Sequence, residues 1–264
     1  MLIRINGLET FYQLEGRGDP VVLLHGWGSS SQSLTGVAAC LAPAFRVFSV
    51  DLPGFGWSQT PAGVWGTAEY ADHVRQFLDQ MEIATTALLG HSFGGRIAIH
   101  LTTQHPARVS RLILVASAGV RPTRGARFHL RVGITKALRC LLRVPGLRGV
   151  GERLGSRWRA RVGSRDYLAA GPLRPTLVKV VNEDLTPVLA TVQAPTLLLW
   201  GDQDQEVRRP AVEVMAANIP RARLTVFPGA GHFPFQDAPE TFCGAVLAFL
   251  QEGPGVNAPG GSRR

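Results

Sequence analysis

The sequence is poor in cysteine. Only Cys40, Cys140 and Cys243 occur among 264 residues, and their neighbours are mostly apolar. An odd number of widely spaced cysteines argues against both a disulfide framework and a metal site. We therefore expect three buried thiols and no bound metal ion.

The chain also lacks long apolar segments. Although 45% of its residues are hydrophobic, no window approaches the roughly 18 to 20 consecutive apolar residues that a membrane span needs. Residues 1–14 alternate polar and apolar side chains around Asn6-Gly7, which is typical of two strands joined by a turn and not of a secretory leader. These absences predict a globular protein in the cytoplasm, with no transmembrane segment.

What the sequence does contain is a regular alternation of two patterns. Short, nearly continuous apolar runs occur at 21–24, 47–50, 87–89, 112–115, 196–200 and 224–227. Helical spacing of apolar residues occurs at 31–41, 67–81, 95–104, 210–219 and 239–250. Such runs are typical of parallel strands buried on both faces, so the alternation predicts an α/β fold with a mostly parallel, doubly wound sheet. The active site of such a sheet lies beyond the carboxyl ends of its strands.

The pentapeptide Gly90-His91-Ser92-Phe93-Gly94 matches G-x-S-x-G and lies between a predicted strand and a predicted helix. A serine on such a sharp turn has a strained backbone, and flanking glycines allow other backbone to come close. The turn exposes the hydroxyl beside the unpaired N–H groups of the first helical turn. The pattern alone is common in a chain with 30 glycines, so its strand-to-helix setting carries the prediction of a nucleophile.

Further chemically active residues follow other predicted strands. They are His25-Gly26-Trp27-Gly28, Asp51, Gly201 to Asp204, and His232. A serine hydroxyl is a poor nucleophile at neutral pH, so it needs an imidazole to take its proton and a carboxylate to orient that imidazole. Ser92, Asp204 and His232 provide this set in the chain order Ser, Asp, His.

These motifs together resemble the α/β-hydrolase superfamily over nearly the whole chain, from about Leu2 to Leu250. The matching segments are His25-Gly26-Trp27-Gly28, Asp51-Leu52-Pro53-Gly54-Phe55-Gly56-Trp57-Ser58, Gly90-His91-Ser92-Phe93-Gly94-Gly95, Trp200-Gly201-Asp202-Gln203-Asp204 and Gly231-His232-Phe233. The resemblance implies an eight-stranded sheet with an inserted helical cap and no cofactor. We expect the hydrolase core at 1–119 and 188–251, the cap at 120–187, and a disordered tail at 252–264.

The same resemblance implies a role for each site residue. Ser92 would be the nucleophile, His232 the general base and Asp204 the carboxylate that orients it. The backbone N–H groups of Trp27 and Phe93 would form the oxyanion hole, and Trp27, Phe93 and Phe233 would line the substrate pocket.

Some assignments have alternatives. Asp202 competes with Asp204 for the role of the acid, although the family pattern favours the second position of the D-x-D step. His25 and Asp51 are expected to shape their loops, since aspartate commonly fixes a turn by hydrogen bonds. No motif surrounds His73, His100, His105 or His129, so we expect these to be surface or packing residues. The segment 206–210 departs from the apolar-Pro step of the family, so the path of that loop is open.

The predicted cap has an unusual charge. Residues 121–179 hold 15 Lys and Arg against only Glu152 and Asp166, a net charge of +13. Leu130, Ile134, Leu138 and Leu141 form an apolar helical stripe, opposite Lys136, Arg139 and Arg143. This basic amphipathic helix is either a solvated outer face or a surface that attracts an anionic substrate, an acidic carrier protein or a membrane. No motif for nucleic-acid recognition accompanies the charge.

The sequence thus predicts a serine hydrolase that cleaves a carboxylic ester of a small or medium acyl substrate through an acyl-enzyme. The alternatives are a carbon-carbon bond hydrolase acting on a vinylogous diketone acid and an esterase acting on acyl groups held by a carrier protein. Phe233 disfavours the first, because that branch usually has Trp after the catalytic histidine. Ser92 disfavours dehalogenases and epoxide hydrolases, which have Asp at the nucleophile position. A non-catalytic ligand-binding protein on the same fold is the alternative from another class.

Overall fold

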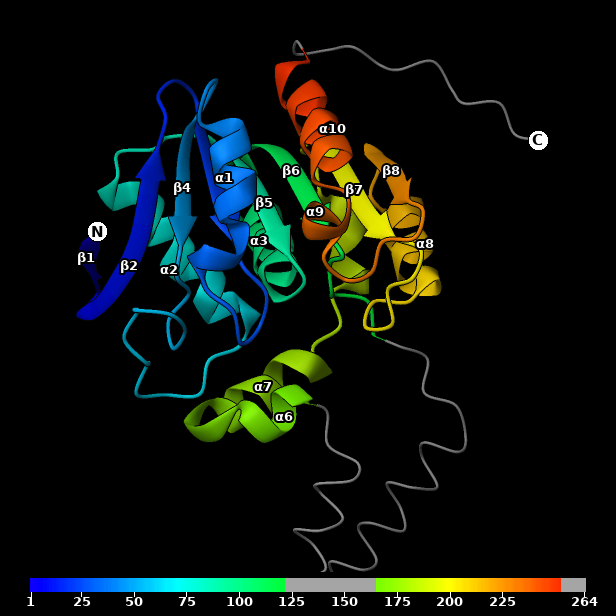
Figure 1. Ribbon diagram of the computed structural model, residues 1–264. Helices are drawn as coiled ribbons and strands as arrows, with labels where there is room; N and C mark the ends of the chain where they lie inside the picture. The colour runs from blue at the N-terminus through cyan, green and yellow to red at the C-terminus, as the bar shows by residue number, and fades with distance from the viewer. Residues whose placement is uncertain (122–164, 253–264) are drawn as a thin grey trace, which may run out of the picture.

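The computed structural model describes residues 1–121 and 165–252 of the chain. A central eight-stranded sheet has the strand order β1-β2-β4-β3-β5-β6-β7-β8 (Figure 1). The β1–β2 and β2–β4 pairs are antiparallel, and every later pair in this order is parallel. The strands are β1 (Leu2–Ile5), β2 (Leu8–Glu15), β3 (Pro20–Leu24), β4 (Arg46–Val50), β5 (Thr86–His91), β6 (Val109–Val115), β7 (Thr196–Gly201) and β8 (Ala222–Phe227). The predicted mostly parallel α/β sheet is confirmed.

Each apolar run that predicted a strand lies in one, and the N-terminal hairpin turns at Asn6-Gly7. Both turn residues have positive φ, 45° for Asn6 and 83° for Gly7. Asparagine and glycine tolerate this conformation, which suits the twist of a tight hairpin. The central strands β3 and β5 are almost wholly buried because helices cover both faces of the sheet.

The helices pack on the two faces in separate groups. Buried residues of α2 and α3, with Met215 of α8, belong to one apolar core, and those of α1, α9 and α10 belong to the other. Their bounds are α1 (Thr35–Leu41), α2 (Thr67–Gln80), α3 (Phe93–Gln104), α8 (Arg209–Asn218), α9 (Pro234–Asp237) and α10 (Pro239–Gln251). Short 3₁₀ helices are η1 (Ser31–Leu34), η2 (Pro106–Arg108) and η4 (Thr186–Thr191). The five helices predicted from apolar spacing are therefore all present.

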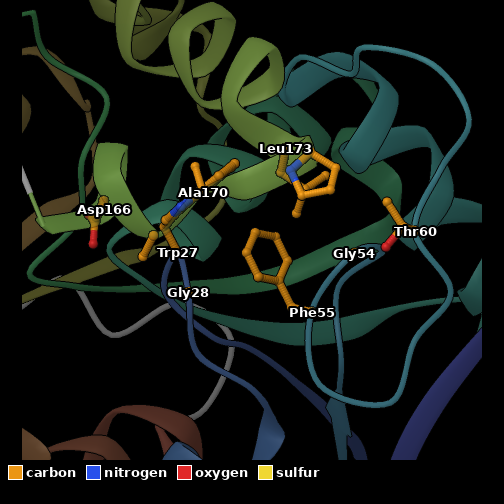
Figure 2. Close-up of a pocket in the computed structure, with 10 residues that line it drawn as sticks. Trp27, Gly28, Gly54, Phe55, Thr60, Asp166, Ala170 and Leu173 are labelled. Carbon is orange, nitrogen blue, oxygen red and sulfur yellow. The ribbon is translucent and has the colours of Figure 1, made fainter. Parts of the chain in front are cut away.

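The described part of the predicted cap consists of α6 (Arg165–Ala169), η3 (Gly171–Leu173) and α7 (Arg174–Asn182). These elements lie beyond the end of the sheet toward which β7 points (Figure 1). Leu173 lies over Gly54 and Phe55 of the loop after β4 (Figure 2), so close that a Cβ on Gly54 would be 2.8 Å from Leu173 Cδ1. The predicted amphipathic helix around 130–143 and the predicted disordered tail beyond 252 lie outside the described residues.

Polar contacts fasten α7 to the core. The carboxylate of Glu183 accepts hydrogen bonds from the backbone N and the Oγ1 of Thr67, the first residue of α2. Lys179 Nζ is 2.8 Å from Glu69 Oε1, and Arg96 Nη1 donates to the carbonyl of Glu183 at 3.1 Å. Residues from the predicted cap therefore complete the start of a core helix.

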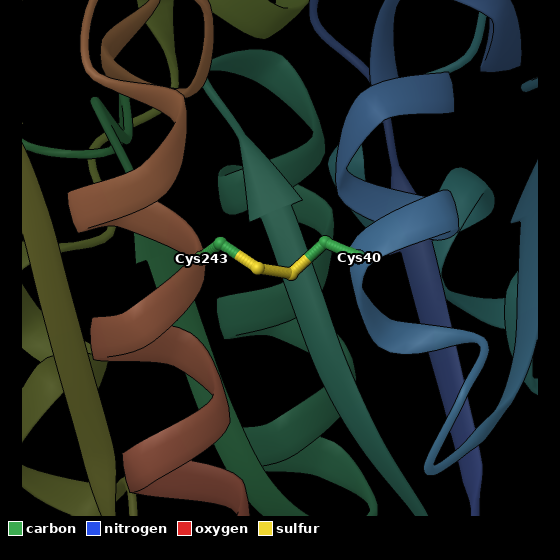
Figure 3. The surroundings of a disulfide bond; sticks show 2 residues. All are labelled: Cys40 and Cys243. Atoms are coloured by element: carbon green, nitrogen blue, oxygen red, sulfur yellow. A yellow bond between two sulfur atoms is a disulfide. The ribbon is translucent and has the colours of Figure 1, made fainter.

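Two cysteines differ from the expectation. Cys40 of α1 and Cys243 of α10 form a disulfide, with their Cα atoms 6.3 Å apart (Figure 3). The prediction of free thiols was wrong for both residues, while Cys140 lies outside the described residues. Their separation of 203 residues gave no sequence signal. The pairing exists only because α1 and α10 pack side by side on the same face of the sheet.

No described helix combines the length and the apolar character needed to cross a membrane.

Candidate active site

Ser92 lies at the junction of β5 and α3, as its motif predicted. Its φ of 51° and ψ of −106° are rarely adopted by a residue with a side chain, so the backbone there is strained. The Ser92 N–H donates to the Val115 carbonyl, and its own carbonyl accepts from Gly95 N and Ala118 N. A Cβ at Gly90 or Gly94 would collide with the Gly94 or Leu24 backbone, respectively. The two glycines thus allow the tight turn that presents the serine.

The loop after β3 passes beside this turn. A Cβ built on Gly26 would lie 3.5 Å from Ser92 Cβ, so the backbone next to Trp27 adjoins the nucleophile position. The N–H groups of Trp27 and Phe93 donate to no other residue in the described part of the chain. Phe93 is the first residue of α3 and Trp27 lies in the loop after β3; unpaired donors of this kind are suited to stabilise an oxyanion.

His25 and Asp51 hold this loop in place. Burial lowers the pKa of His25, and its neutral ring donates from Nδ1 to the Gly26 carbonyl while Nε2 accepts from Leu52 N at 3.0 Å. The Asp51 carboxylate accepts from Ser31 N and Trp57 N at 2.6 and 2.9 Å. The expected loop-shaping roles of both residues are confirmed.

The structure brings together Asp204 and His232. Asp204 Oδ2 is 2.8 Å from His232 Nδ1, and the side chains are 0% and 9% exposed. The other carboxylate oxygen of Asp204 accepts from Glu206 N and Val207 N. The loop at 206–210, whose path the sequence left open, therefore holds this carboxylate. Asp202 instead accepts from Gly229 N at 2.8 Å. The geometry thus favours Asp204 over Asp202 as the partner of the imidazole.

Glu206 provides a second carboxylate that sequence reasoning missed. Its Oε2 is 3.3 Å from His232 Nε2, and its side chain is 63% exposed. A carboxylate contact to Nε2 is favourable only when that nitrogen carries a proton. In the described structure no hydrogen bond joins Ser92 Oγ to the His232 ring. Such catalytic contacts are often long before substrate binds.

His91, which sequence reasoning treated only as a variable position of its motif, contacts the backbone of His232. Its Nε2 is 2.9 Å from the His232 carbonyl and donates to it, which fixes the neutral tautomer. Burial, together with the nearby His232, lowers the pKa of His91 to about 3. His91 therefore supports the position of His232 without becoming charged.

A cavity of about 310 Å³ lies between the loops after β3 and β4 on one side and α6 and η3 on the other (Figure 2). Trp27 lines it, and the Trp27 ring is 5.2 Å from that of Phe93, which is buried behind it. Phe233 lies elsewhere, 37% exposed, with its ring 5.3 Å from the His232 ring. Of the three predicted pocket residues, Trp27 is the one that lines this cavity.

The other described histidines are packed or partly buried, and no described contact links them to the site. His73 is buried and its Nε2 is 2.9 Å from Thr10 Oγ1, while burial lowers its pKa to about 4. His100 Nδ1 is 3.2 Å from Thr67 Oγ1. His129 lies outside the described residues. Asp166, at the cavity, was noted in the sequence only as one of two acids in a basic segment.

Comparisons with known proteins agree with this architecture. Residues 21–245 match the alpha/beta hydrolase family. The chain is 32% identical to a 2-hydroxymuconate semialdehyde hydrolase from Pseudomonas putida, over 93% of this chain and 92% of that protein. It is also 32% identical to a pimeloyl-[acyl-carrier protein] methyl ester esterase from Nitrosomonas europaea, over 86% and 94%. An esterase structure from Exiguobacterium antarcticum superposes with a TM-score of 0.74 at 25% identity, covering 95% of this chain and 99% of that one. The chain belongs to the alpha/beta hydrolase family.

Proposed function

We propose that the protein is a serine hydrolase that cleaves carboxylic esters of small or medium acyl groups. The observation that carries the proposal is the pair of Asp204 Oδ2 and His232 Nδ1 at 2.8 Å, together with a serine that has the strained backbone of a nucleophile turn. A buried carboxylate fixes the imidazole tautomer whose Nε2 can accept a proton.

Each of these groups has a role in the proposed reaction. Nε2 of His232 takes the proton of Ser92, and Ser92 Oγ attacks the ester carbonyl. The N–H groups of Trp27 and Phe93 stabilise the oxyanion, and the alcohol leaves with the proton returned by His232. Water activated by His232 then hydrolyses the acyl-enzyme. General base catalysis contributes about 10² to 10⁴ in rate and each oxyanion donor about 10² to 10³.

Two narrower functions are supported by relatives. The Nitrosomonas europaea relative is a methyl ester esterase of an acyl-carrier-protein substrate, which suits the proposed ester chemistry. The Pseudomonas putida relative hydrolyses 2-hydroxymuconate semialdehyde, which favours carbon-carbon cleavage as the second candidate. Phe233 after His232 favours the ester hydrolase of the two.

Ser92→Ala tests the proposal. Turnover of p-nitrophenyl esters of graded chain length should fall by more than about 10³-fold, because the nucleophile is lost, and the circular dichroism spectrum should not change. Wild type should react with a fluorophosphonate label and the variant should not. Ser110→Ala, on the exposed surface of β6, is the matched control and should behave as wild type.

The possible results separate the candidates. A Ser92→Ala protein that keeps more than a few per cent of its activity would refute the nucleophile assignment. Labelling of Ser92 without turnover of any ester would favour the second candidate or a ligand-binding protein. Turnover of a dienone ring-cleavage product would then identify a carbon-carbon bond hydrolase, and no turnover of it would favour a ligand-binding protein.

A further inference from the structure

The cavity beside the proposed active site has an uneven chemical lining. Of the described residues that line it, Asp166 is the one with an ionisable side chain. Figure 2 shows Asp166 at one end, next to Trp27 and Ala170, and Thr60 at the other. Apolar side chains, among them Phe55 and Leu173, occupy the space between. The cavity therefore suits an apolar chain, with a negative charge at one end.

That charge lies near the proposed reacting centre. Asp166 lines the cavity from α6 and stays in contact with solvent; partial burial raises the pKa of its carboxyl, and the nearby His232 opposes that shift. Trp27, whose N–H is a proposed oxyanion donor, lines the same end of the cavity. A substrate chain in this cavity would therefore pass close to Asp166.

The cations of 120–187 whose side chains are described, Arg121, Arg174 and Lys179, do not line the cavity. Lys179 is paired with Glu69 at 2.8 Å, and the guanidinium of Arg174 lies 5.1 Å from the centre of the Tyr167 ring. Glu206, 3.3 Å from His232 Nε2, adds a second negative charge near the reacting centre. The described ionisable groups that line the cavity or contact His232 Nε2 are therefore acidic.

We propose that Asp166 determines substrate charge: the cavity admits neutral or cationic acyl chains and rejects chains that end in a carboxylate. This inference rests on the proposed ester hydrolase function and narrows its substrate class. A carboxylate in the cavity would lose hydration and meet the like charge of Asp166, and both effects oppose binding. The diketone acid considered from the sequence belongs to the rejected class.

A charge series of methyl esters tests the proposal on the full-length protein. The substrates are methyl 6-aminohexanoate, dimethyl adipate and monomethyl adipate, which are cationic, neutral and anionic, and acid release is followed in a pH-stat. Wild type should show a lower kcat/KM for the anion than for the neutral diester, by about five- to tenfold after correction for two ester groups, as expected for a like charge in a partly solvated site.

Asp166→Asn should remove most of this difference. The anionic ester should gain several-fold in kcat/KM, the cationic ester should lose a similar factor, and the neutral diester should change by less than about twofold, because only the charge is altered. Asp19→Asn is the matched control, since Asp19 lies exposed before β3 at the opposite end of the sheet. It should leave the order of the three substrates unchanged.

The outcomes distinguish this proposal from the function on which it rests. Equal or better use of monomethyl adipate by wild type, or the same charge order in Asp166→Asn, overturns the role of Asp166 while leaving the ester hydrolase intact. Absence of both ester turnover and fluorophosphonate labelling in wild type overturns the hydrolase proposal, and the role of Asp166 falls with it.

Discussion

Removal of the Cys40–Cys243 disulfide should destabilise the protein substantially. The bridge closes a loop of 203 residues between α1 and α10. For a loop of this length, the loss of chain entropy in the unfolded state corresponds to about 5 kcal/mol at 25 °C. This value is an upper estimate, because native strain and residual structure in the unfolded chain reduce it. For a protein of this size the melting temperature should fall by roughly 10 to 20 °C.

The assay compares thermal and urea unfolding of the wild type with and without reductant, and of a Cys40→Ala, Cys243→Ala double variant. Reduced wild type and the double variant should melt at similar temperatures, well below oxidised wild type. Cys140→Ala keeps the bridge and is the control; it should respond to reductant as the wild type does. Thiol titration of denatured, unreduced wild type should find one free thiol of three cysteines.

Two results would contradict this reasoning. One is a titration of three free thiols in unreduced protein, which means that the bridge does not form. The other is an oxidised protein whose melting temperature does not respond to reductant. Persistent disulfides are typical of oxidising compartments, so the same thiol titration on protein trapped in cells also tests the predicted cytoplasmic location.

Three further predictions concern the site and the core. Asp204→Asn should lower kcat by about 10³- to 10⁴-fold and Asp202→Asn by less than tenfold, because only the first holds the imidazole tautomer; the reverse order in ester kinetics would move the acid. Glu206→Gln should speed fluorophosphonate labelling about two- to fivefold. The Glu206 carboxylate favours the protonated form of His232 Nε2, which cannot take the proton of Ser92, and an exposed contact of this kind contributes at most about 1 kcal/mol. Unchanged or slower labelling contradicts this role of Glu206. The buried His73 and His91 have pKa values lowered to about 4 and about 3, so the unfolded chain binds protons first as pH falls below 6.5. The free energy of unfolding should drop by about 3 kcal/mol between pH 7.5 and 5.5, His73→Asn should roughly halve that drop, and a flat urea-unfolding profile would exclude it.

The fold was predictable because the signals that specify it are local. The buried strand β5 reads as an apolar run, and Gly90 and Gly94 mark the turn that follows it. Parallel strands end at a common edge, so residues after separate strands could be placed together without knowing any distance. This is why the sequence brought Ser92, Asp204 and His232 into one region, where the structure pairs the last two.

Residues missed by the sequence reasoning depend on long-range packing. Glu206 contacts His232 because the loop after β7 folds back over the end of β8. Asp166 reaches the cavity only because α6 and the loop that carries Trp27, far apart in the chain, line the same space. The pairing of Cys40 with Cys243 likewise follows from helix packing across 203 residues. None of these contacts has a spacing rule that a single sequence reveals.

The contact of Glu183 with Thr67 has a consequence for exchanging caps between relatives. Helix α2 begins after Gly66, which has no side chain to bind the first N–H groups, and the carboxylate of Glu183 accepts from Thr67 instead. A helix start that loses such a cap loses about 1 kcal/mol. A chimera that replaces 120–187 thus also removes the N-terminal cap of a core helix, unless the donor segment carries an acidic residue at the same place. The described part of the predicted cap is therefore also a structural part of the domain that it covers.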